Sequence, residues 1–450
     1  MLVATMRTWR TGALLLTLLV LPLTPCAAET LVRGPYLQRV APDSVVVRWS
    51  TAEESVATVE YGTSPEDLAR VAAGDAPGRD HAVELTGLEA GRRHHYAVGD
   101  ANGRLANGAG SFATPPATGS AAPFRVWVTG DVGTGGLEPR RVRDAFFAWA
   151  GDRGADLWLM LGDNAYNDGT EAEYQRGVFA VYGDQLRSLP LFPTLGNHDG
   201  HSASSAAETG PYYDLFTLPA GGESGGVPSG TEAYYSFDYG NAHFVCLESY
   251  SLDRRPGSPM LEWLAADLAA TTQRWIVVYF HHPPYTRGSH DSDRELQLRE
   301  MRAWVMPVLE AHGVDLVLAG HSHSYERSYL VDGHYGHSST FSPSHLVDGG
   351  DGRPAGDGPY RKGLGAHRGT VYVVAGSSAR LGGGRLDHPV MAVGMNRLGS
   401  LALDFAARRL DAYFVDDLGV VRDHFAIVKG AVDLKLPEPP PKLKVITGEG

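Results

Sequence analysis

The chain has 450 residues, a formal net charge of −13 at pH 7, 43% hydrophobic residues and 20% charged residues. This length suffices for two or three domains with cores of their own, and the composition is that of a globular protein. The acidic balance argues against nucleic acid or an anionic membrane as the main partner, because both would repel the chain. It does not exclude small anions held in a local site.

The first residues have the layout of a secretory signal peptide. Arg7 and Arg10 precede an apolar stretch over about residues 12–23. This stretch is too short to span a bilayer comfortably, so residues 1–28 are predicted to be cleaved after Ala28 and the chain to be secreted, periplasmic or at the cell surface. No later run predicts a transmembrane helix. Cys26 leaves a lipid anchor open, and its removal would leave Cys246 without a disulfide partner.

Residues 29–117 are predicted to form a small all-β sandwich. Short strand-like segments such as SVVVRWST, ATVEYGT and HAVELTGL are separated by Gly, Pro and Asp turns. Trp49 and the segment LTGLEAGRRHHYAV resemble an immunoglobulin-like fibronectin type III module, with Tyr96 near the corner tyrosine of that family. A packing or spacing role without chemistry is the favoured interpretation.

Residues 122–430 are predicted to form an α/β layered domain. Strand-like runs including FRVWVTGD, DLWLMLGD, RWIVVYFHHPP and DLVLAGHSH alternate with helical stretches over residues 139–151, 259–272 and 293–313. The Gly-, Ser-, Asp- and His-rich stretch 331–368 is predicted to be a solvated loop, either an active-site cover or mobile. The Pro-rich residues 431–450 are predicted to be an exposed tail.

The strand-like runs end in potential metal ligands, and in such folds ligands bind outside the carboxyl ends of the strands. Singly, each such Asp or Asn is a common turn or capping residue, and each His a common structural residue. Together they indicate a pair of divalent or trivalent ions, because hard oxygen donors occur beside imidazoles and one carboxylate, Asp163, could bridge two ions. The candidates are Asp131 in GDVG, Asp163 and Tyr166 in GDNAY, Asn197 and His198 in GNHD, His281 in VYFH, and His321 and His323 in GHSH.

These motifs, in this order, resemble the purple acid phosphatases within the calcineurin-like metallophosphoesterase superfamily. The resemblance covers about residues 124–427 and implies a layered β-sandwich flanked by helices. It also implies two ligand sets that share Asp163. One metal is held by Asp131, Asp163, Tyr166 and His323, and the other by Asp163, Asn197, His281 and His321.

Tyr166 separates this family from related phosphoesterases that hold two divalent ions. A phenol is a poor ligand until a small trivalent cation lowers its pKa, so Tyr166 predicts ferric iron at the first position. The alternative is a buried tyrosine that only packs. The second metal is expected to be zinc, manganese or ferrous iron.

The resemblance also implies the chemistry. A hydroxide bound by the metals is expected to attack phosphorus without a phosphoenzyme. His198 is expected at the substrate, where it neutralises charge or protonates the leaving group, with Asp199 orienting its ring. His290 is expected to face the substrate as well. The residue after it is Asp291, where plant members of the family have a second histidine, so the acid for the leaving group stays open.

The favoured function is therefore an exported acid phosphatase that hydrolyses monoesters of small phosphorylated compounds. A phosphodiesterase or nucleotidase on the same metal pair is the alternative, because loops rather than ligands set the substrate range. A different class of function is a surface-binding protein with a retired second domain. Under each of these interpretations, the sequence leaves the oligomeric state of the protein open.

Overall fold

The computed structural model describes Met1 and residues 31–430. The predicted leader beyond Met1 and the Pro-rich tail lie outside the described residues. The first domain contains five antiparallel strands, and the long β2 pairs with β1, β3 and β4. These strands are β1 (Leu31–Ala41), β2 (Ser44–Gly62), β3 (Arg70–Thr86), β4 (Arg93–Asp100) and β5 (Gly103–Ala113).

Two seven-stranded sheets make up the second domain. The first has the order β18 (Met391–Met395), β13 (Tyr325–Ser328), β17 (Val371–Ala375), β12 (Leu316–Ala319), β11 (Trp275–Phe280), β10 (Ala242–Cys246) and β9 (Tyr235–Tyr239). The second has the order β16 (Tyr360–Lys362), β21 (Val421–Lys429), β20 (Arg409–Asp416), β19 (Gly399–Phe405), β6 (Phe124–Thr129), β7 (Leu157–Met160) and β8 (Leu191–Pro193). Strands β10, β11, β12 and β17 are parallel, as are β6, β7 and β8.

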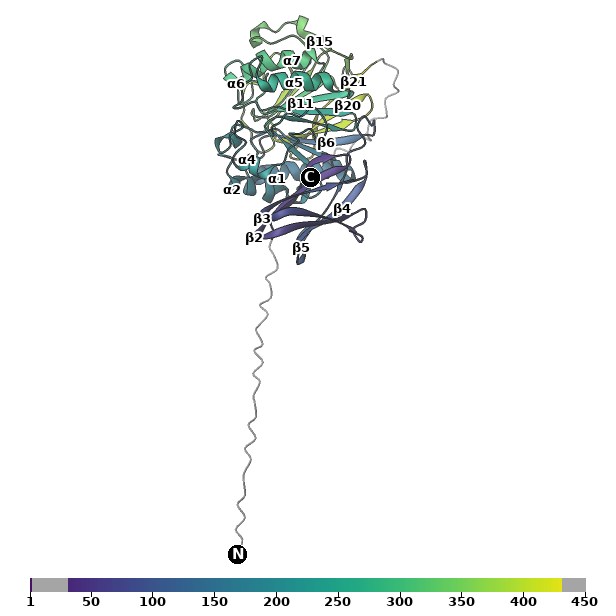
Figure 1. Ribbon diagram of the computed structural model, residues 1–450. Helices are drawn as coiled ribbons and strands as arrows, with labels where there is room; N and C mark the ends of the chain where they lie inside the picture. Colours follow the sequence, from purple (N-terminus) through teal and green to yellow (C-terminus); the bar gives the residue numbers. More distant parts are fainter. Residues whose placement is uncertain (2–30, 431–450) are drawn as a thin grey trace, which may run out of the picture.

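Helices cover the two sheets, which confirms the predicted layered α/β fold (Figure 1). The helices are α1 (Leu137–Ala150), α2 (Glu171–Tyr174), α3 (Ala180–Leu186), α4 (Pro211–Leu215), α5 (Pro259–Ala270), α6 (Leu296–Glu300) and α7 (Met306–Ala311). A π-helical turn, Met301–Val305, connects α6 to α7. It precedes Pro307, which lacks the backbone N–H that a regular helix would use. None of the helices within residues 31–430 has the length and apolar character needed to cross a membrane.

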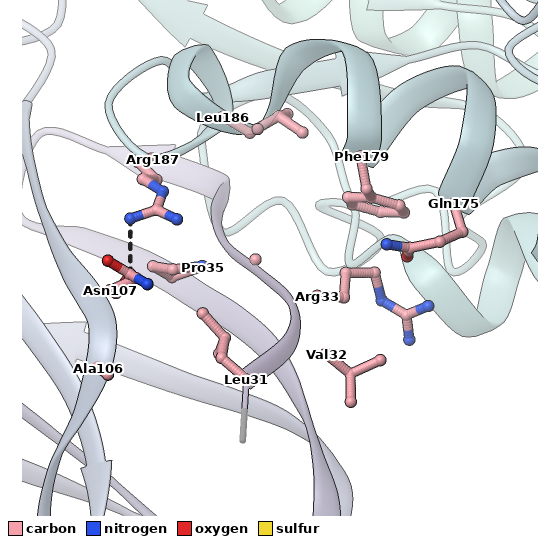
Figure 2. Close-up of a pocket in the computed structure, with 12 residues that line it drawn as sticks. Leu31, Val32, Arg33, Pro35, Ala106, Asn107, Gln175, Phe179, Leu186 and Arg187 are labelled. Atoms are coloured by element: carbon pink, nitrogen blue, oxygen red, sulfur yellow. Dashed lines mark hydrogen bonds between the residues drawn. The ribbon is translucent and has the colours of Figure 1, made fainter. Parts of the chain in front are cut away.

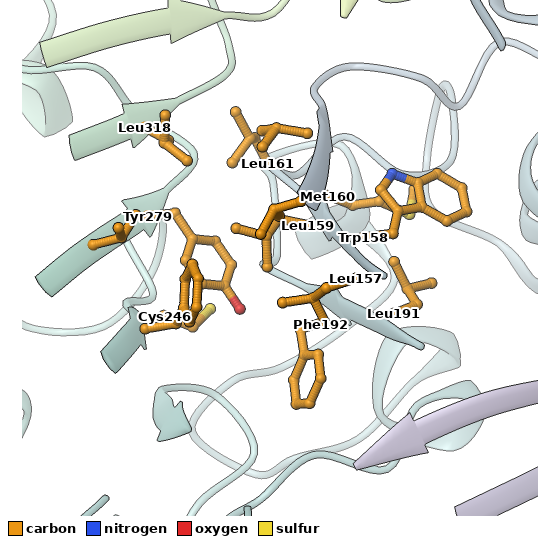
Figure 3. Close-up of a cluster of buried hydrophobic side chains, with 14 of the residues drawn as sticks. Leu157, Trp158, Leu159, Met160, Leu161, Leu191, Phe192, Cys246, Tyr279 and Leu318 are labelled. Atoms are coloured by element: carbon orange, nitrogen blue, oxygen red, sulfur yellow. The ribbon is translucent and has the colours of Figure 1, made fainter. Parts of the chain in front are cut away.

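The core of the second domain lies between the two sheets. Apolar side chains of β7 and β8 face those of β10, β11 and β12 (Figure 3). The opposite face of β7 is equally apolar, because Trp158 packs against Tyr182 of α3 with ring centroids 4.8 Å apart. Residues of β7 are therefore buried on both faces, as the continuous apolar run DLWLML predicts for a central parallel strand.

The stretch 331–368 differs from the predicted solvated loop. It contains β15 (Leu346–Asp348), which pairs with β14 (Leu330–Val331), and β16, which joins the edge of the second sheet. The Lys362 ammonium is buried and donates to three backbone carbonyls, those of Gly313, Val314 and Gly369. The Gly-rich composition hid these short strands, because strands of two or three residues leave no periodic pattern.

Arg33 joins the two domains. Its guanidinium, 5% exposed, donates to Asp80 of β3 at 2.6 Å and to Glu171 of α2 at 2.9 Å. Nearby, the Tyr36 hydroxyl donates to the Leu215 carbonyl at 2.7 Å. Strand β1 thus contacts the second domain along its length, and the first domain is docked by specific polar contacts.

Tyr96, which lies near the position of the corner tyrosine in fibronectin type III modules, also belongs to this junction. Its hydroxyl donates to the carbonyl of Arg187 in the second domain at 2.9 Å, whereas a corner tyrosine bonds within its own sandwich. Arg187 in turn donates to the Asn107 carbonyl at 2.6 Å beside an interdomain cavity of about 420 Å³ (Figure 2). This cavity contains none of the predicted metal ligands.

His243 of β10 lies between two carboxylates and gives the fold a testable pH dependence. Its Nδ1 and Nε2 are each 2.8 Å from an oxygen of Asp238 and Asp267, respectively. Burial opposes the charged ring, but the two carboxylates prevail and raise the pKa of His243 from 6.5 to about 9. A raised pKa means that the imidazolium stabilises the fold fully below pH 6.5, and that this stability is lost as the pH rises through about 9.

We expect His243→Gln to lower the free energy of unfolding by about 3 kcal/mol at pH 6, because Asp238 and Asp267 both lose their charged donor and a neutral amide replaces it. Denaturant titrations at pH 6 and pH 9.5 should show that the variant loses less stability with rising pH than the wild type. His312→Gln is the control, since the His312 ring contacts a backbone carbonyl instead of a carboxylate. An identical pH dependence in wild type and His243→Gln would contradict the assigned imidazolium.

Candidate metal centre

The predicted ligand residues come from the carboxyl ends of parallel strands in both sheets. Asp131 follows β6, Asp163 follows β7 and Asn197 follows β8, while His281 and His321 follow β11 and β12. The two sheets therefore bring residues that lie up to 192 positions apart in the chain to one edge of the sandwich.

Three side chains converge in the first part of the cluster. The Tyr166 hydroxyl lies 3.1 Å from Asp131 Oδ1 and 3.2 Å from His323 Nε2. His323 Nε2 is 3.5 Å from the same Asp131 oxygen. Tyr166 is 2% exposed and Asp131 is fully buried, so this phenol lies within the donor set.

A second group of three converges next to it. Asn197 Oδ1 lies 3.0 Å from His281 Nε2 and 3.0 Å from His321 Nδ1, and these two ring nitrogens are 3.2 Å apart. Asp163 Oδ1 approaches His281 Nε2 to 3.4 Å. Potential ligand atoms of Asp131, Asp163 and His281 also lie within 4.8 Å of one another, which places Asp163 between the two groups.

The orientation of His281 is fixed from behind. Its Nδ1 lies 2.8 Å from the Leu161 carbonyl and donates to it, so Nε2 is the nitrogen that faces Asn197 and His321 and that would bind a metal ion after losing its proton. A backbone carbonyl behind a metal-binding imidazole is a common way to set the ring tautomer.

The donor set fits a pair of metal ions. Two carboxylates, a phenol, an amide oxygen and three imidazoles are the mixture of hard oxygen and nitrogen donors that such ions bind. Glycines leave the room that the donors need: a Cβ at Gly196 would lie 2.2 Å from Asp163 Oδ1, and one at Gly162 would lie 2.5 Å from His281 Nδ1. Many acceptors directed at one buried region require positive charge there.

The charges of these groups are strongly coupled. Burial raises the pKa of Tyr166 well above its ordinary value, and Asp131 and Asp163 raise it further. Burial opposes the charged form of Asp163, yet His281 and His198 outweigh burial and lower the pKa of this carboxyl. Burial lowers the pKa of His321 to about 4, so its ring is neutral and available as a ligand at neutral pH.

His198 lies beside the cluster, but Asp199 does not orient it. His198 Nδ1 is 2.5 Å from the Asn167 carbonyl, and Nε2 is 3.9 Å from Asp163 Oδ2. Asp199 points away and accepts hydrogen bonds from the backbone N–H groups of Asn164, Ala165 and Gly196 and from the Tyr174 hydroxyl. The predicted role of Asp199 is therefore corrected: it holds together the two loops that carry Asp163 and Asn197.

His290 lies over the second group of ligands. Its ring centroid is 3.8 Å from that of His321, and its Nδ1 is 3.0 Å from both carboxylate oxygens of Glu295. Glu295 Oε2 also lies 3.2 Å from His321 Nε2, so one carboxylate holds the outer nitrogens of both rings. Sequence reasoning missed Glu295, because nothing in its local pattern distinguishes it from a surface residue that begins α6.

Residues next to the ligands have supporting contacts. His282 Nδ1 is 2.9 Å from the Ser249 hydroxyl. Arg327 donates to both oxygens of the buried Asp423, at 2.6 and 3.2 Å. Glu326 accepts from the Arg287 backbone N–H at 3.2 Å and so supports the loop that leads to His290.

Comparison with known proteins identifies both domains. A calcineurin-like phosphoesterase model matches residues 124–325, and a model of the N-terminal domain of purple acid phosphatases matches residues 33–114. Purple acid phosphatase 18 of Arabidopsis thaliana is 29% identical over 309 residues, which cover 64% of either chain. A phosphoenolpyruvate phosphatase of Allium cepa is 26% identical over 311 residues, which cover 64% of this chain and 60% of that one.

Solved structures show the same fold. A purple acid phosphatase from yellow lupin (Lupinus luteus) seeds aligns with a TM-score of 0.64 at 20% identity, covering 89% of this chain and 74% of that one. PhoD aligns with a TM-score of 0.62 at 15% identity, covering 88% and 90%. The matched region spans about 64% of the length of the Arabidopsis relatives.

Fold and donor set together define a metallophosphoesterase of the calcineurin-like superfamily. The chain therefore combines a calcineurin-like phosphoesterase domain with an N-terminal domain of the purple acid phosphatase type, and the curated relatives that it resembles are purple acid phosphatases. This resemblance implies a dinuclear metal centre.

The requirement for glycine at position 196, beside the Asp163 carboxylate, can be tested without an assay of turnover. We expect Gly196→Ala to weaken metal binding by at least about tenfold, because the new Cβ would collide with the backbone nitrogen and the carboxylate of Asp163 and displace both. Gly183→Ala is the matched control, since a Cβ at this helical position meets nothing within 4 Å. Metal content after equilibrium dialysis should fall in Gly196→Ala alone, with circular dichroism confirming that both variants fold. Equal metal content in both would exclude this requirement.

Proposed function

We propose that this chain is an exported phosphatase that hydrolyses phosphate monoesters on a dinuclear metal centre. The observation that carries this proposal is the convergence of Asp131, Tyr166 and His323 beside Asn197, His281 and His321, with Asp163 between them. Relatives named purple acid phosphatases and a phosphoenolpyruvate phosphatase support small phosphorylated compounds as substrates. Export rests on the leader-like residues 1–28. The domain limits 29–117 and 122–430 are part of the same proposal.

Each metal position has its own ligands in this proposal. Asp131, Asp163, Tyr166 and His323 hold ferric iron, because a phenolate suits a hard trivalent ion. A divalent ion, zinc, manganese or ferrous iron, is held by Asp163 together with Asn197, His281 and His321. When bound, the pair supplies Lewis acidity to the phosphoryl group and activates the attacking water.

Protein side chains supply the remaining functions. His198 Nδ1 donates to the Asn167 carbonyl, so its Nε2 is the nitrogen available to the substrate. In His290, Glu295 occupies Nδ1 and leaves Nε2 available in the same way. Two imidazoles of fixed orientation beside the metal ligands can bind phosphoryl oxygens and deliver a proton to the leaving alcohol.

The first test of this function removes the Asn197 amide, whose oxygen lies between His281 and His321. We expect Asn197→Ala to lower hydrolysis of an aryl phosphate by about 100-fold or more while the chain stays folded, because the amide oxygen is lost from the second position. Asn102→Ala, in an exposed turn of the first domain, is the control and should behave as wild type. Unchanged turnover in Asn197→Ala would mean that the site is misassigned.

The same assay separates the alternatives. A clear preference for a bis-aryl diester over the aryl monoester would replace the monoesterase proposal with a phosphodiesterase. Absence of bound metal together with absence of hydrolysis would favour a retired enzyme with a surface-binding role. Retention of all seven ligand residues argues against retirement, since unused ligands are not maintained by packing alone.

The ferric assignment is tested by colour. We expect the metal-replete protein to show a broad visible absorption band that is absent from Tyr166→Phe, because only the phenolate can transfer charge to iron. Metal content measured on both proteins separates loss of the phenolate from loss of iron. A colourless wild type with two zinc or manganese ions would keep the phosphoesterase and reduce Tyr166 to a packing residue.

A further inference from the structure

Arg380 lies at the exposed side of the metal-ligand cluster. It follows β17 in the segment SSARLGGGRLD, and its guanidinium carbon is 4.4 Å from the centre of the Tyr166 ring. The Arg380 side chain is exposed to solvent, whereas Tyr166 is buried. A cation over an aromatic face is held by the ring quadrupole, so the guanidinium has a defined position beside the predicted site.

The backbone on the far side of Arg380 is anchored to the segments that carry the site. Gly382 N–H donates to the His323 carbonyl at 3.0 Å, and Leu386 N–H donates to the Arg287 carbonyl at 2.9 Å. Close packing of Gly384 on Gly288 leaves no room for a side chain there. The loop therefore keeps a fixed place relative to His323 and to the segment that precedes His290.

Arg380 has no protein partner for its N–H groups within residues 31–430. No ion pair or hydrogen bond of its side chain occurs there, although the same loop contains the pair Arg385–Asp387 at 3.3 Å. Arg287 beneath the loop pairs with Asp293 and Asp387. A guanidinium presents five donors in a planar fork that matches a carboxylate or a phosphate. The unpaired fork is consequently free to bind an anion at the entrance of the site.

We propose that Arg380 binds a second anionic group of the substrate and so determines specificity. The inference rests on the proposed function. It assigns the transferred phosphoryl group to the metal ligands with His198 and His290, and a neighbouring phosphate or carboxylate of the same molecule to Arg380. The position of the guanidinium supports this division, because it lies over the ring of Tyr166 and therefore beside the converging donor atoms, not among them.

The test compares substrates that differ only in the second charge. We expect Arg380→Ala to lower the ratio of kcat/KM for 3-carboxyphenyl phosphate to that for phenyl phosphate by about tenfold, the usual effect of losing a charge-assisted hydrogen-bonded pair. Arg380→Lys should restore part of the ratio, since it keeps the charge but loses the fork. Arg385→Ala, in the same loop but already paired with Asp387, should leave the ratio unchanged.

Inorganic pyrophosphate distinguishes a second phosphate from a carboxylate. A loss on pyrophosphate alone assigns phosphate as the partner of Arg380, and a loss on 3-carboxyphenyl phosphate alone assigns carboxylate. Equal losses of kcat/KM on phenyl phosphate and on both doubly anionic substrates would overturn the inference, and so would an unchanged ratio for both. Metal content and circular dichroism should match the wild type in every variant.

Calorimetric binding to the metal-replete protein separates this inference from the proposed function. Arg380→Ala should weaken binding of pyrophosphate about tenfold more than binding of inorganic phosphate. If the wild type hydrolyses none of the substrates but shows this difference in binding, the proposed function fails and the role of Arg380 stands. Equal weakening of both ligands, or weakening of neither, would overturn the role of Arg380 whatever the activity.

Discussion

The structure depends on the concentration of acidic and imidazole groups in one largely buried cluster at the edge of the sandwich. Asp131 and Asp163 are almost completely buried. Their carboxylates lie close to His281, and the buried phenol of Tyr166 contacts Asp131. A buried charge without hydrogen bonds or an opposite charge is costly, so these carboxylates depend on the imidazoles and backbone N–H groups around them and on the cations that the cluster would bind. The sandwich of two sheets serves to hold such a cluster at one edge, with the strands that lead to it buried on both faces.

Backbone geometry at the cluster shows the same constraint. Asp131, Asp163 and His321 all have positive φ, at 60°, 51° and 64°, a region that residues with a Cβ rarely adopt. Such conformations cost of the order of 1 kcal/mol or more each and persist only where the surroundings impose them. Asp199 is one source of that restraint, because its carboxylate binds N–H groups on both sides of the cleft between the Asp163 and Asn197 loops.

Much of this arrangement could be predicted from the sequence because parallel strands that end in Asp, Asn or His determine where the side chains emerge. Asp131, Asp163, Asn197, His281 and His321 each follow such a strand, and these strands, although only three to six residues long, lie in apolar runs that end at a polar residue. By contrast, the sequence carries no such pattern to show which residues from distant parts of the chain contact these ligands.

Glu295, Asp199 and Tyr96 are examples of residues whose roles this strand pattern does not predict. Each makes its decisive contact through tertiary packing: Glu295 with two histidines, Asp199 with backbone N–H groups of two loops, and Tyr96 with the other domain. The adjacency of Asp199 to His198 suggested a local pair, but consecutive residues of a turn point in different directions. The local sequence pattern therefore predicted the metal ligands. The residues that hold these ligands in place, such as Glu295 and Asp199, could be recognised only from the three-dimensional structure.

The first domain is connected to the metal site through helix α2. Arg33 binds Glu171 at the start of this helix, and two residues later the Glu173 carboxylate accepts hydrogen bonds from the N–H groups of Asn167 and Asp168. Asn167 follows Tyr166, and its carbonyl orients His198. Tyr174, the last residue of α2, donates to Asp199. One turn of helix thus supports the phenol, the substrate-facing imidazole and the carboxylate that ties the loops together. Because Arg33 fixes that turn from the other domain, the N-terminal sandwich stabilises the geometry of the site without contributing a ligand.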